Sequence, residues 1–156
     1  MENSINYAEL LQITYSEYRT ELCGDKDGFT FLLRNPERPD GDITVLFENG
    51  VFTLRFFSMD EVIEEGFGEL VALVDELLCD ESILFELYVG GEYVLGGTRS
   101  TEAIGIYRAP YRFARELADG DPALYTEIIG YLEKGNCHVR LRGWRTFRCR
   151  SIILAK

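Results

Sequence analysis

The sequence contains one histidine, His138, and no two of its four cysteines are separated by the two residues of a Cys-x-x-Cys pair. Structural zinc sites need closely spaced Cys and His ligands, so the sequence predicts no zinc framework. His138 follows Cys137 directly, but adjacent residues of a strand point to opposite faces, which argues against a Cys–His catalytic pair. The cysteines are therefore expected to be free thiols, packed as small core residues in a reducing compartment.

Long apolar runs are also missing. No window approaches the roughly 18 consecutive apolar residues that a membrane-spanning helix needs. The first residues carry acids at Glu2 and Glu9 and no basic region ahead of an apolar run, which is unlike a signal peptide. We expect a cytoplasmic protein that has no contact with membrane.

The sequence lacks the usual signatures of nucleotide and calcium sites. The glycine-rich segment 89–100 has no Gly-Lys-Ser/Thr ending, which a phosphate loop requires. Neither 25–28 nor 40–42 fits the calcium-loop pattern. Acidic residues are too numerous for any pair to stand out as catalytic. We therefore expect no cofactor, no metal and no catalytic residues, and we favour a non-enzymatic protein.

What the chain does have is charge of opposite sign in its two parts. The formal net charge is −11; residues 1–100 hold 6 basic and 21 acidic side chains, while residues 101–156 hold 10 basic and 6 acidic ones. A strongly negative protein repels nucleic acid at long range and attracts basic partners. The balance weighs against nucleic-acid binding.

The pattern of apolar and turn residues predicts an α+β fold with a mainly antiparallel sheet built from hairpins. Asn49-Gly50 lies between two apolar segments, the strongest hairpin signal in the chain. Asp121-Pro122 is typical of a helix start. The segment 15–23 is ambiguous, but the alternation of its residues fits a strand. The other predicted strands are 29–34, 43–48, 51–57, 83–89, 92–95, 103–107, 137–142 and 146–154, with a loop beginning at Gly96-Gly97. The predicted helices are 6–13 (with Ser4 as cap), 60–79, 111–117 and 122–132. The length of 156 residues is typical of one domain, so we predict that 1–156 form a single α+β domain with about three to four helices packed on the sheet.

The predicted helix 60–79 carries the strongest candidate for a partner-binding surface. Apolar residues recur along it at steps of four and three, which indicates one buried stripe. From Asp60 to Glu92 there are 11 acids and no Lys or Arg. A solvated helix face is the ordinary explanation for such acids. The functional hypothesis is a docking surface for a basic protein partner, carried by Glu61, Glu64, Glu65 and Glu69.

The basic C-terminal segment is the second candidate. Its last 20 residues hold six basic side chains and no acid. If strands 137–142 and 146–154 pair, their arginines are expected to form a ladder. The favoured interpretation is that the protein's own carboxylates or those of a second copy neutralise it. The functional hypothesis is an anion site formed by Arg140, Arg142, Arg148 and Arg150, and an RNA or DNA ligand is a lesser alternative.

No motif identifies a family. In size and charge the chain resembles many small acidic α+β bacterial proteins, among them immunity proteins that neutralise toxins, and this resemblance assigns no role to any residue. Three hypotheses follow. The first is a protein-binding or inhibitor module, the second an anionic-ligand-binding or enzymatic domain that uses the arginine face. The third is a homo-oligomer in which acidic and basic halves meet.

Overall fold

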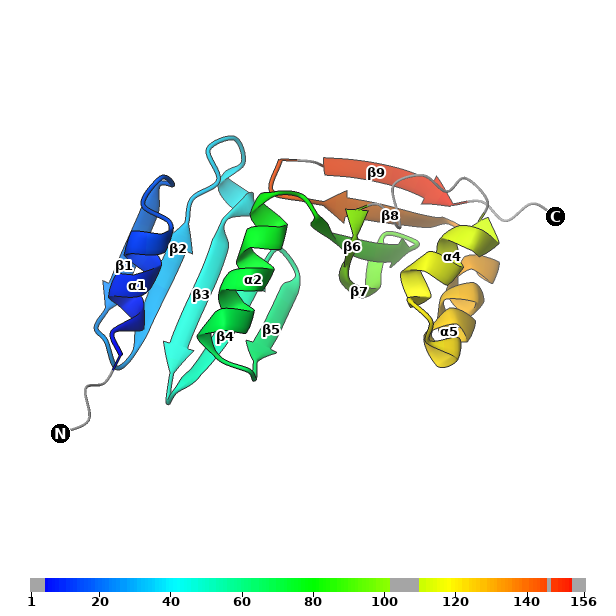
Figure 1. The fold of residues 1–156 in the computed structure, drawn as a ribbon. Helices are drawn as coiled ribbons and strands as arrows, with labels where there is room; N and C mark the ends of the chain where they lie inside the picture. The colour runs from blue at the N-terminus through cyan, green and yellow to red at the C-terminus, as the bar shows by residue number, and fades with distance from the viewer. Residues whose placement is uncertain (1–4, 102–109, 146, 153–156) are drawn as a thin grey trace. The chain divides into compact units, whose positions relative to one another are not determined.

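The computed structural model describes residues 5–101, 110–145 and 147–152. In this part of the chain, strands form two antiparallel sheets, one of five strands in the order β1-β2-β3-β4-β5 and one of four in the order β7-β6-β8-β9. Helices pack beside both sheets (Figure 1). The predicted α+β fold with a mainly antiparallel sheet is confirmed.

The contacts divide the chain into two compact units, Met1–Asp75 and Glu76–Lys156. The boundary falls inside helix α2 (Phe67–Leu78). This division concerns contacts and not folding, so the single-domain interpretation stays a prediction. We call the two parts unit 1 and unit 2 and describe each by itself.

The sheet of unit 1 is a meander in which each strand pairs with the next along the chain. Asn49 and Gly50 join β3 to β4 with positive φ angles of 52° and 78°, as the predicted hairpin requires. The predicted strand positions agree with the structure to within a few residues. The five strands are β1 (Thr20–Gly24), β2 (Phe29–Leu33), β3 (Ile43–Glu48), β4 (Val51–Phe56) and β5 (Met59–Ile63).

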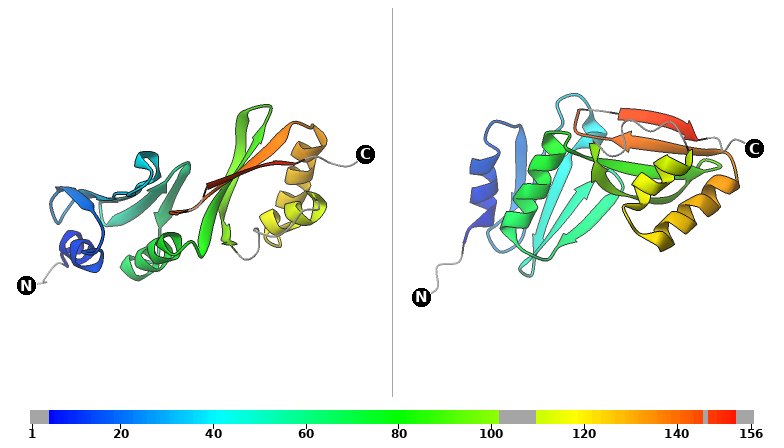
Figure 2. Two further views of the ribbon diagram at one scale, coloured as in Figure 1. Left: turned by 90° about the horizontal axis from the view of Figure 1, so that it is seen from above. Right: turned by 45° about the vertical axis from the view of Figure 1, so that its right-hand side comes forward.

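Two helices cover one face of this sheet. α1 (Tyr7–Thr14) and α2 lie on the same side of it (Figure 2). The N-cap of α1 is Asn6, whose side chain accepts a hydrogen bond from the N–H of Glu9; the predicted cap, Ser4, lies outside the described residues. The ring of Tyr7 contacts Phe52 on β4 and Phe67 on α2, so both helices share one aromatic core with the sheet.

The predicted helix 60–79 is wrong in its first half, because β5 occupies Met59–Ile63 and α2 begins only at Phe67. Met59 and Ile63 are buried and four residues apart, and that spacing keeps two side chains on one face in a strand as well as in a helix. Pairing with β4 selected the strand. Gly66, at φ +90°, then separates the strand from the helix.

Unit 2 is a four-stranded sheet with a helix pair on one face. The strands are β6 (Ser82–Val89), β7 (Glu92–Ser100), β8 (Cys137–Arg142) and β9 (Phe147–Ile152), and the helices are α4 (Pro110–Ala118) and α5 (Pro122–Glu133). As predicted, Asp121 caps α5 and Pro122 opens it. Alternate residues of β6 and β8 form the core with the two helices, namely Ile83, Phe85, Leu87, Val139 and Leu141 against Phe113, Leu117, Ile128 and Leu132.

The predicted loop at Gly96-Gly97 is also wrong, since both glycines lie inside β7. A Cβ atom on Gly96 would stand 2.6 Å from the carbonyl oxygen of Phe85 and 2.8 Å from the hydroxyl of Tyr93. The glycine therefore permits a close approach of β7 to β6 and marks no turn. The predicted strand 103–107 lies outside the described residues, as do Thr146 and the end of the last predicted strand.

No helix in the described ranges is long and apolar enough to cross a membrane.

Candidate functional site

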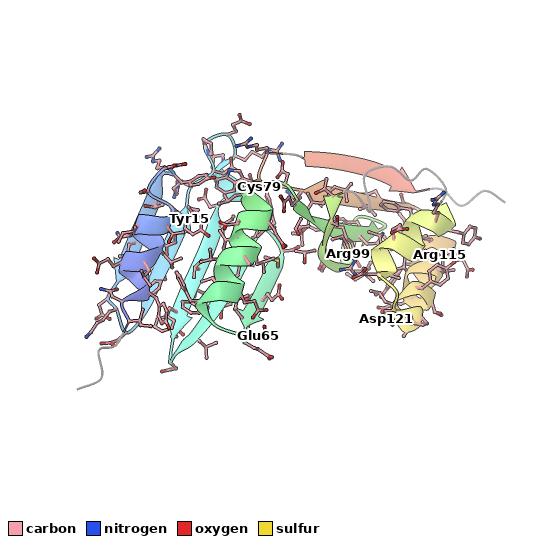
Figure 3. All side chains as sticks on the ribbon, in the orientation of Figure 1. Tyr15, Glu65, Cys79, Arg99, Arg115 and Asp121 are labelled. Atoms are coloured by element: carbon pink, nitrogen blue, oxygen red, sulfur yellow. The ribbon has the colours of Figure 1, made fainter. Side chains whose placement is uncertain are left out.

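The four glutamates predicted to bind a partner lie on consecutive segments of unit 1 and not on one helix. Glu61 is on β5, Glu64 and Glu65 are in the connection, and Glu69 is in the first turn of α2. All four are exposed. Figure 3 places Glu65 where β5 leads into α2. We call these four residues the acidic edge, because β5 is the last strand of its sheet among the described residues.

An exposed apolar side chain lies beside the acidic edge, and one of the four carboxylates makes a structural contact. Val62, on β5 beside Glu61, is 55% exposed. The carboxylate of Glu69 accepts a hydrogen bond of 2.8 Å from the N–H of Glu65, which stabilises the start of α2. Asp60, next to the edge, pairs with Arg55 on β4 at 3.2 Å. Glu69 thus has a structural role, whereas the side chains of Glu61, Glu64 and Glu65 form no hydrogen bond or ion pair with the residues that the structure describes.

The predicted arginine ladder of unit 2 is wrong in register. β8 and β9 do pair, but Arg140 stands opposite Cys149 and Arg142 opposite Phe147. Positions 148 and 150 stand opposite Leu141 and Val139. Because residues directly opposite in a sheet belong to the same face, positions 148 and 150 share the face of Leu141 and Val139 and not that of Arg140 and Arg142. The side chains of Arg148 and Arg150 lie outside those that the structure describes.

Arg142 is neutralised inside unit 2. Its Nε contacts Oε1 of Glu86 on β6, and the Glu86 side chain is 3% exposed. The hydroxyl of Tyr88 also lies 3.4 Å from Glu86 Oε1. Burial by itself lowers the pKa of Arg142, but the hydrogen bond and the charge of Glu86 outweigh it and raise that pKa. Arg142 is therefore engaged by a buried carboxylate.

Arg140 and His138 meet at the ring of Tyr88. Tyr88 is the cross-strand partner of His138, and their rings stack with centroids 5.0 Å apart and an interplanar angle of 3°. The guanidinium carbon of Arg140 lies 4.5 Å from the centre of the same ring. All three side chains are half-buried. The three residues, which we call the Tyr88 cluster, combine two nitrogen-donor groups on one rigid support.

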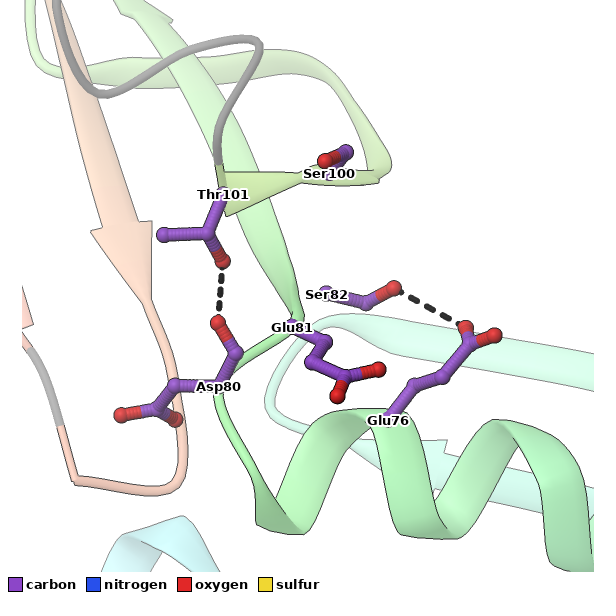
Figure 4. A pocket seen from close by; sticks show the side chains of 6 residues that line it. All are labelled: Glu76, Asp80, Glu81, Ser82, Ser100 and Thr101. Atoms are coloured by element: carbon purple, nitrogen blue, oxygen red, sulfur yellow. Dashed lines mark hydrogen bonds between the residues drawn. The ribbon is translucent and has the colours of Figure 1, made fainter.

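Unit 2 also has a cavity of about 810 Å³, lined by Glu76, Asp80, Glu81, Ser82, Ser100 and Thr101 (Figure 4). Ser82 donates a hydrogen bond of 3.0 Å to Glu76, and the hydroxyl of Thr101 donates to the carbonyl of Asp80. The carboxylate of Asp80 accepts from the N–H of Arg145 at 3.3 Å. These polar groups tie the segment after α2 to β7 and to the β8–β9 connection, so their clearest role is structural.

The thiols differ in exposure. Cys137 is buried and its thiol lies 3.0 Å from the carbonyl oxygen of Tyr131, and burial raises the pKa of that thiol. Cys23 and Cys79 are exposed free thiols. The prediction that the cysteines are core residues is right for Cys137 and wrong for these two. Within the described ranges, no three His, Cys, Asp or Glu side chains are grouped to hold a metal ion.

Sequence reasoning missed Glu86 and Tyr88. A signal was present, because Glu86 is a charged residue in the middle of an apolar strand, and a buried charge needs a partner. The partner itself was not evident, since strands β6 and β8 lie far apart in the sequence.

Comparison with protein-family models, with curated proteins and with solved structures finds no match to this chain.

Proposed function

We propose that the chain is a non-enzymatic protein-binding module whose acidic edge docks a basic partner protein. The observation that carries this proposal is the exposure of Val62 beside Glu61 on the last strand of its sheet, close to Glu64 and Glu65. Carboxylates steer a basic partner and select it, while an exposed apolar side chain at the same place gives contact area to bury. The most specific version of this proposal is an inhibitor of the immunity type, which covers a basic functional site of its target.

Among the described residues β5 is an edge strand, so its outer backbone groups pair with no described strand and add to this surface. An extended segment of a partner can pair with such a strand through main-chain hydrogen bonds. Charged side chains on an edge also discourage pairing with unsuitable chains, so acids on β5 favour a basic segment over an acidic or apolar one. The free cysteines among the described side chains, Cys23, Cys79 and Cys137, suit a reducing cytoplasm, where we place the module.

The test is affinity capture with the full chain at low and moderate salt, comparing wild type with the triple variant Glu61→Lys, Glu64→Lys and Glu65→Lys. Glu69 is left unchanged because its carboxylate bonds to the N–H of Glu65. The matched control is Glu92→Lys, Glu127→Lys and Glu133→Lys, which makes the same charge change at exposed positions of unit 2.

We expect wild type and the control to capture a basic protein at low salt and to release it at moderate salt. The edge variant should capture at least tenfold less of the same protein. Equal capture by all three proteins would exclude the acidic edge as the docking surface. Recovery of a second copy alone would favour the homo-oligomer.

A second candidate function is the binding of an anionic ligand by the arginine face of unit 2. Arg140 favours it, because no described carboxylate forms a salt bridge with that side chain.

A further inference from the structure

We propose that Arg140 and His138 form a binding site for a phosphate group, with Tyr88 as the residue that positions both. This inference rests on the second candidate function and narrows it. Of the four arginines predicted to bind an anion, it retains Arg140 alone, and it adds His138 and Tyr88, which were not among the predicted site residues.

The backbone places the two donor groups on the same face at a suitable separation. His138 and Arg140 are two residues apart on β8, so both side chains project from the same face of the sheet. Their Cα atoms are roughly 7 Å apart. The face is the one opposite the helix pair, because the intervening Val139 packs in the core with the helices. Tyr88 lies beside His138 on the neighbouring strand.

The ring of Tyr88 holds both donors in place. It stacks on the imidazole of His138 at 5.0 Å, and the guanidinium of Arg140 lies 4.5 Å from its centre. A long arginine side chain normally loses rotamer freedom when it binds a ligand. Contact with a fixed ring reduces that loss before the ligand arrives, which is the effect of preorganisation.

The charge of the site is available to a ligand. The nearby carboxylate, Glu86, is engaged by Arg142 and so offsets little of the charge of Arg140. No carboxylate of the described residues forms a salt bridge with Arg140. Both Arg140 and His138 are half-buried, which keeps them in reach of solvent while reducing the screening of the charge of Arg140.

The number of acceptor oxygens favours phosphate over carboxylate. A guanidinium fork takes two oxygens of an anion in a bidentate contact. A carboxylate then offers a second residue only the remaining lone pairs of those same two oxygens, whereas a phosphate group still has one or two further oxygens. The imidazole of His138 supplies the further N–H donor.

The experiment is calorimetric titration of the full chain with inorganic phosphate, phenyl phosphate and acetate at fixed ionic strength. The variants are Arg140→Ala, His138→Ala, Tyr88→Phe and Tyr88→Leu. The matched control is Arg115→Ala, which removes an exposed arginine from α4 in the same unit. Circular dichroism of each variant confirms that unit 2 is folded.

We expect saturable phosphate binding by wild type that is at least tenfold tighter than acetate binding. Arg140→Ala weakens phosphate binding by about tenfold or more, the usual effect of losing a hydrogen-bonded charge. His138→Ala weakens it by a smaller factor. Tyr88→Leu weakens it, while Tyr88→Phe, which keeps the ring, binds as wild type does. Tighter binding of phenyl phosphate would identify a phosphate ester as the source, and equal binding would identify free phosphate.

Two results would overturn the assignment in different ways. If wild type binds no phosphate, both this inference and the second candidate function fail. If phosphate binds but Arg140→Ala binds as tightly as wild type, an anion site exists elsewhere, and only the assignment to the Tyr88 cluster fails.

Discussion

The carboxylate of Glu86 on β6 contacts the guanidinium of Arg142 on β8, and the two side chains are only 3% and 15% exposed. Glu86 stands directly opposite Arg140 in the register, so its contact with Arg142 is diagonal across the two strands. This relationship removes Arg142 from the set of binding residues and gives it a structural role.

Arg142→Ala is expected to lower the free energy of unfolding by about 3 kcal/mol, because it leaves the buried carboxylate of Glu86 without its partner. Replacing both residues, as Glu86→Met with Arg142→Leu, should recover most of that loss, since no buried charge remains. Urea unfolding of the two variants measures the difference. A double variant less stable than Arg142→Ala would show that the pair itself is strongly stabilising.

Two glycines of unit 2 should respond to alanine in opposite ways. Gly96→Ala forces a Cβ atom against the backbone of Phe85 and should lower the melting temperature. Gly130 is exposed on α5 with no atom near the added Cβ, so Gly130→Ala should raise stability by about 1 kcal/mol through helix propensity. Thermal unfolding of both variants tests the strand assignment at Gly96. A glycine in an open loop would tolerate alanine with little change in melting temperature.

Tyr15 in unit 1 should make stability depend on high pH. Burial raises the pKa of its hydroxyl well above the ordinary 10.0, and Asp75, which accepts its hydrogen bond at 3.0 Å, raises it further. Above pH 10 the unfolded chain releases this proton while the folded chain keeps it, so the free energy of unfolding falls as pH rises, by up to about 1.4 kcal/mol per pH unit.

Tyr15→Phe should flatten that dependence between pH 9 and 11 in denaturant titrations, because phenylalanine has no proton to release. Tyr111→Phe is the control, since Tyr111 is 50% exposed. An equal slope in wild type and Tyr15→Phe would contradict the assignment of the effect to Tyr15.

The thiols of the native protein should react at different rates with iodoacetamide. Cys23 and Cys79 are exposed and should be alkylated quickly, whereas Cys137 is buried, its pKa is raised, and it should react only after unfolding. Peptide mass spectrometry after a timed reaction follows each site. Rapid labelling of Cys137 in folded protein would show that the core of unit 2 opens readily.

Local chemistry was enough to predict much of the fold. The hairpin at Asn49-Gly50 and the helix start at Asp121-Pro122 follow from backbone preferences of a few adjacent residues, and the structure confirms both. The same reasoning failed at Met59–Ile63, where one apolar spacing fits two kinds of element. Only pairing with β4, a tertiary contact, selects the strand.

For the candidate sites, too, some features follow from the sequence alone and others only from the tertiary structure. The sequence by itself determined the charge of each part of the chain and the shared face of His138 and Arg140, because both follow from composition and from the two-residue period of a strand. Tertiary structure decided the partners. The register of β8 against β6 and β9 paired Arg142 with Glu86, stacked His138 on Tyr88 and separated Arg140 from positions 148 and 150. Register depends on packing between distant segments, and a shift of one residue would move every side chain of the strand to the other face.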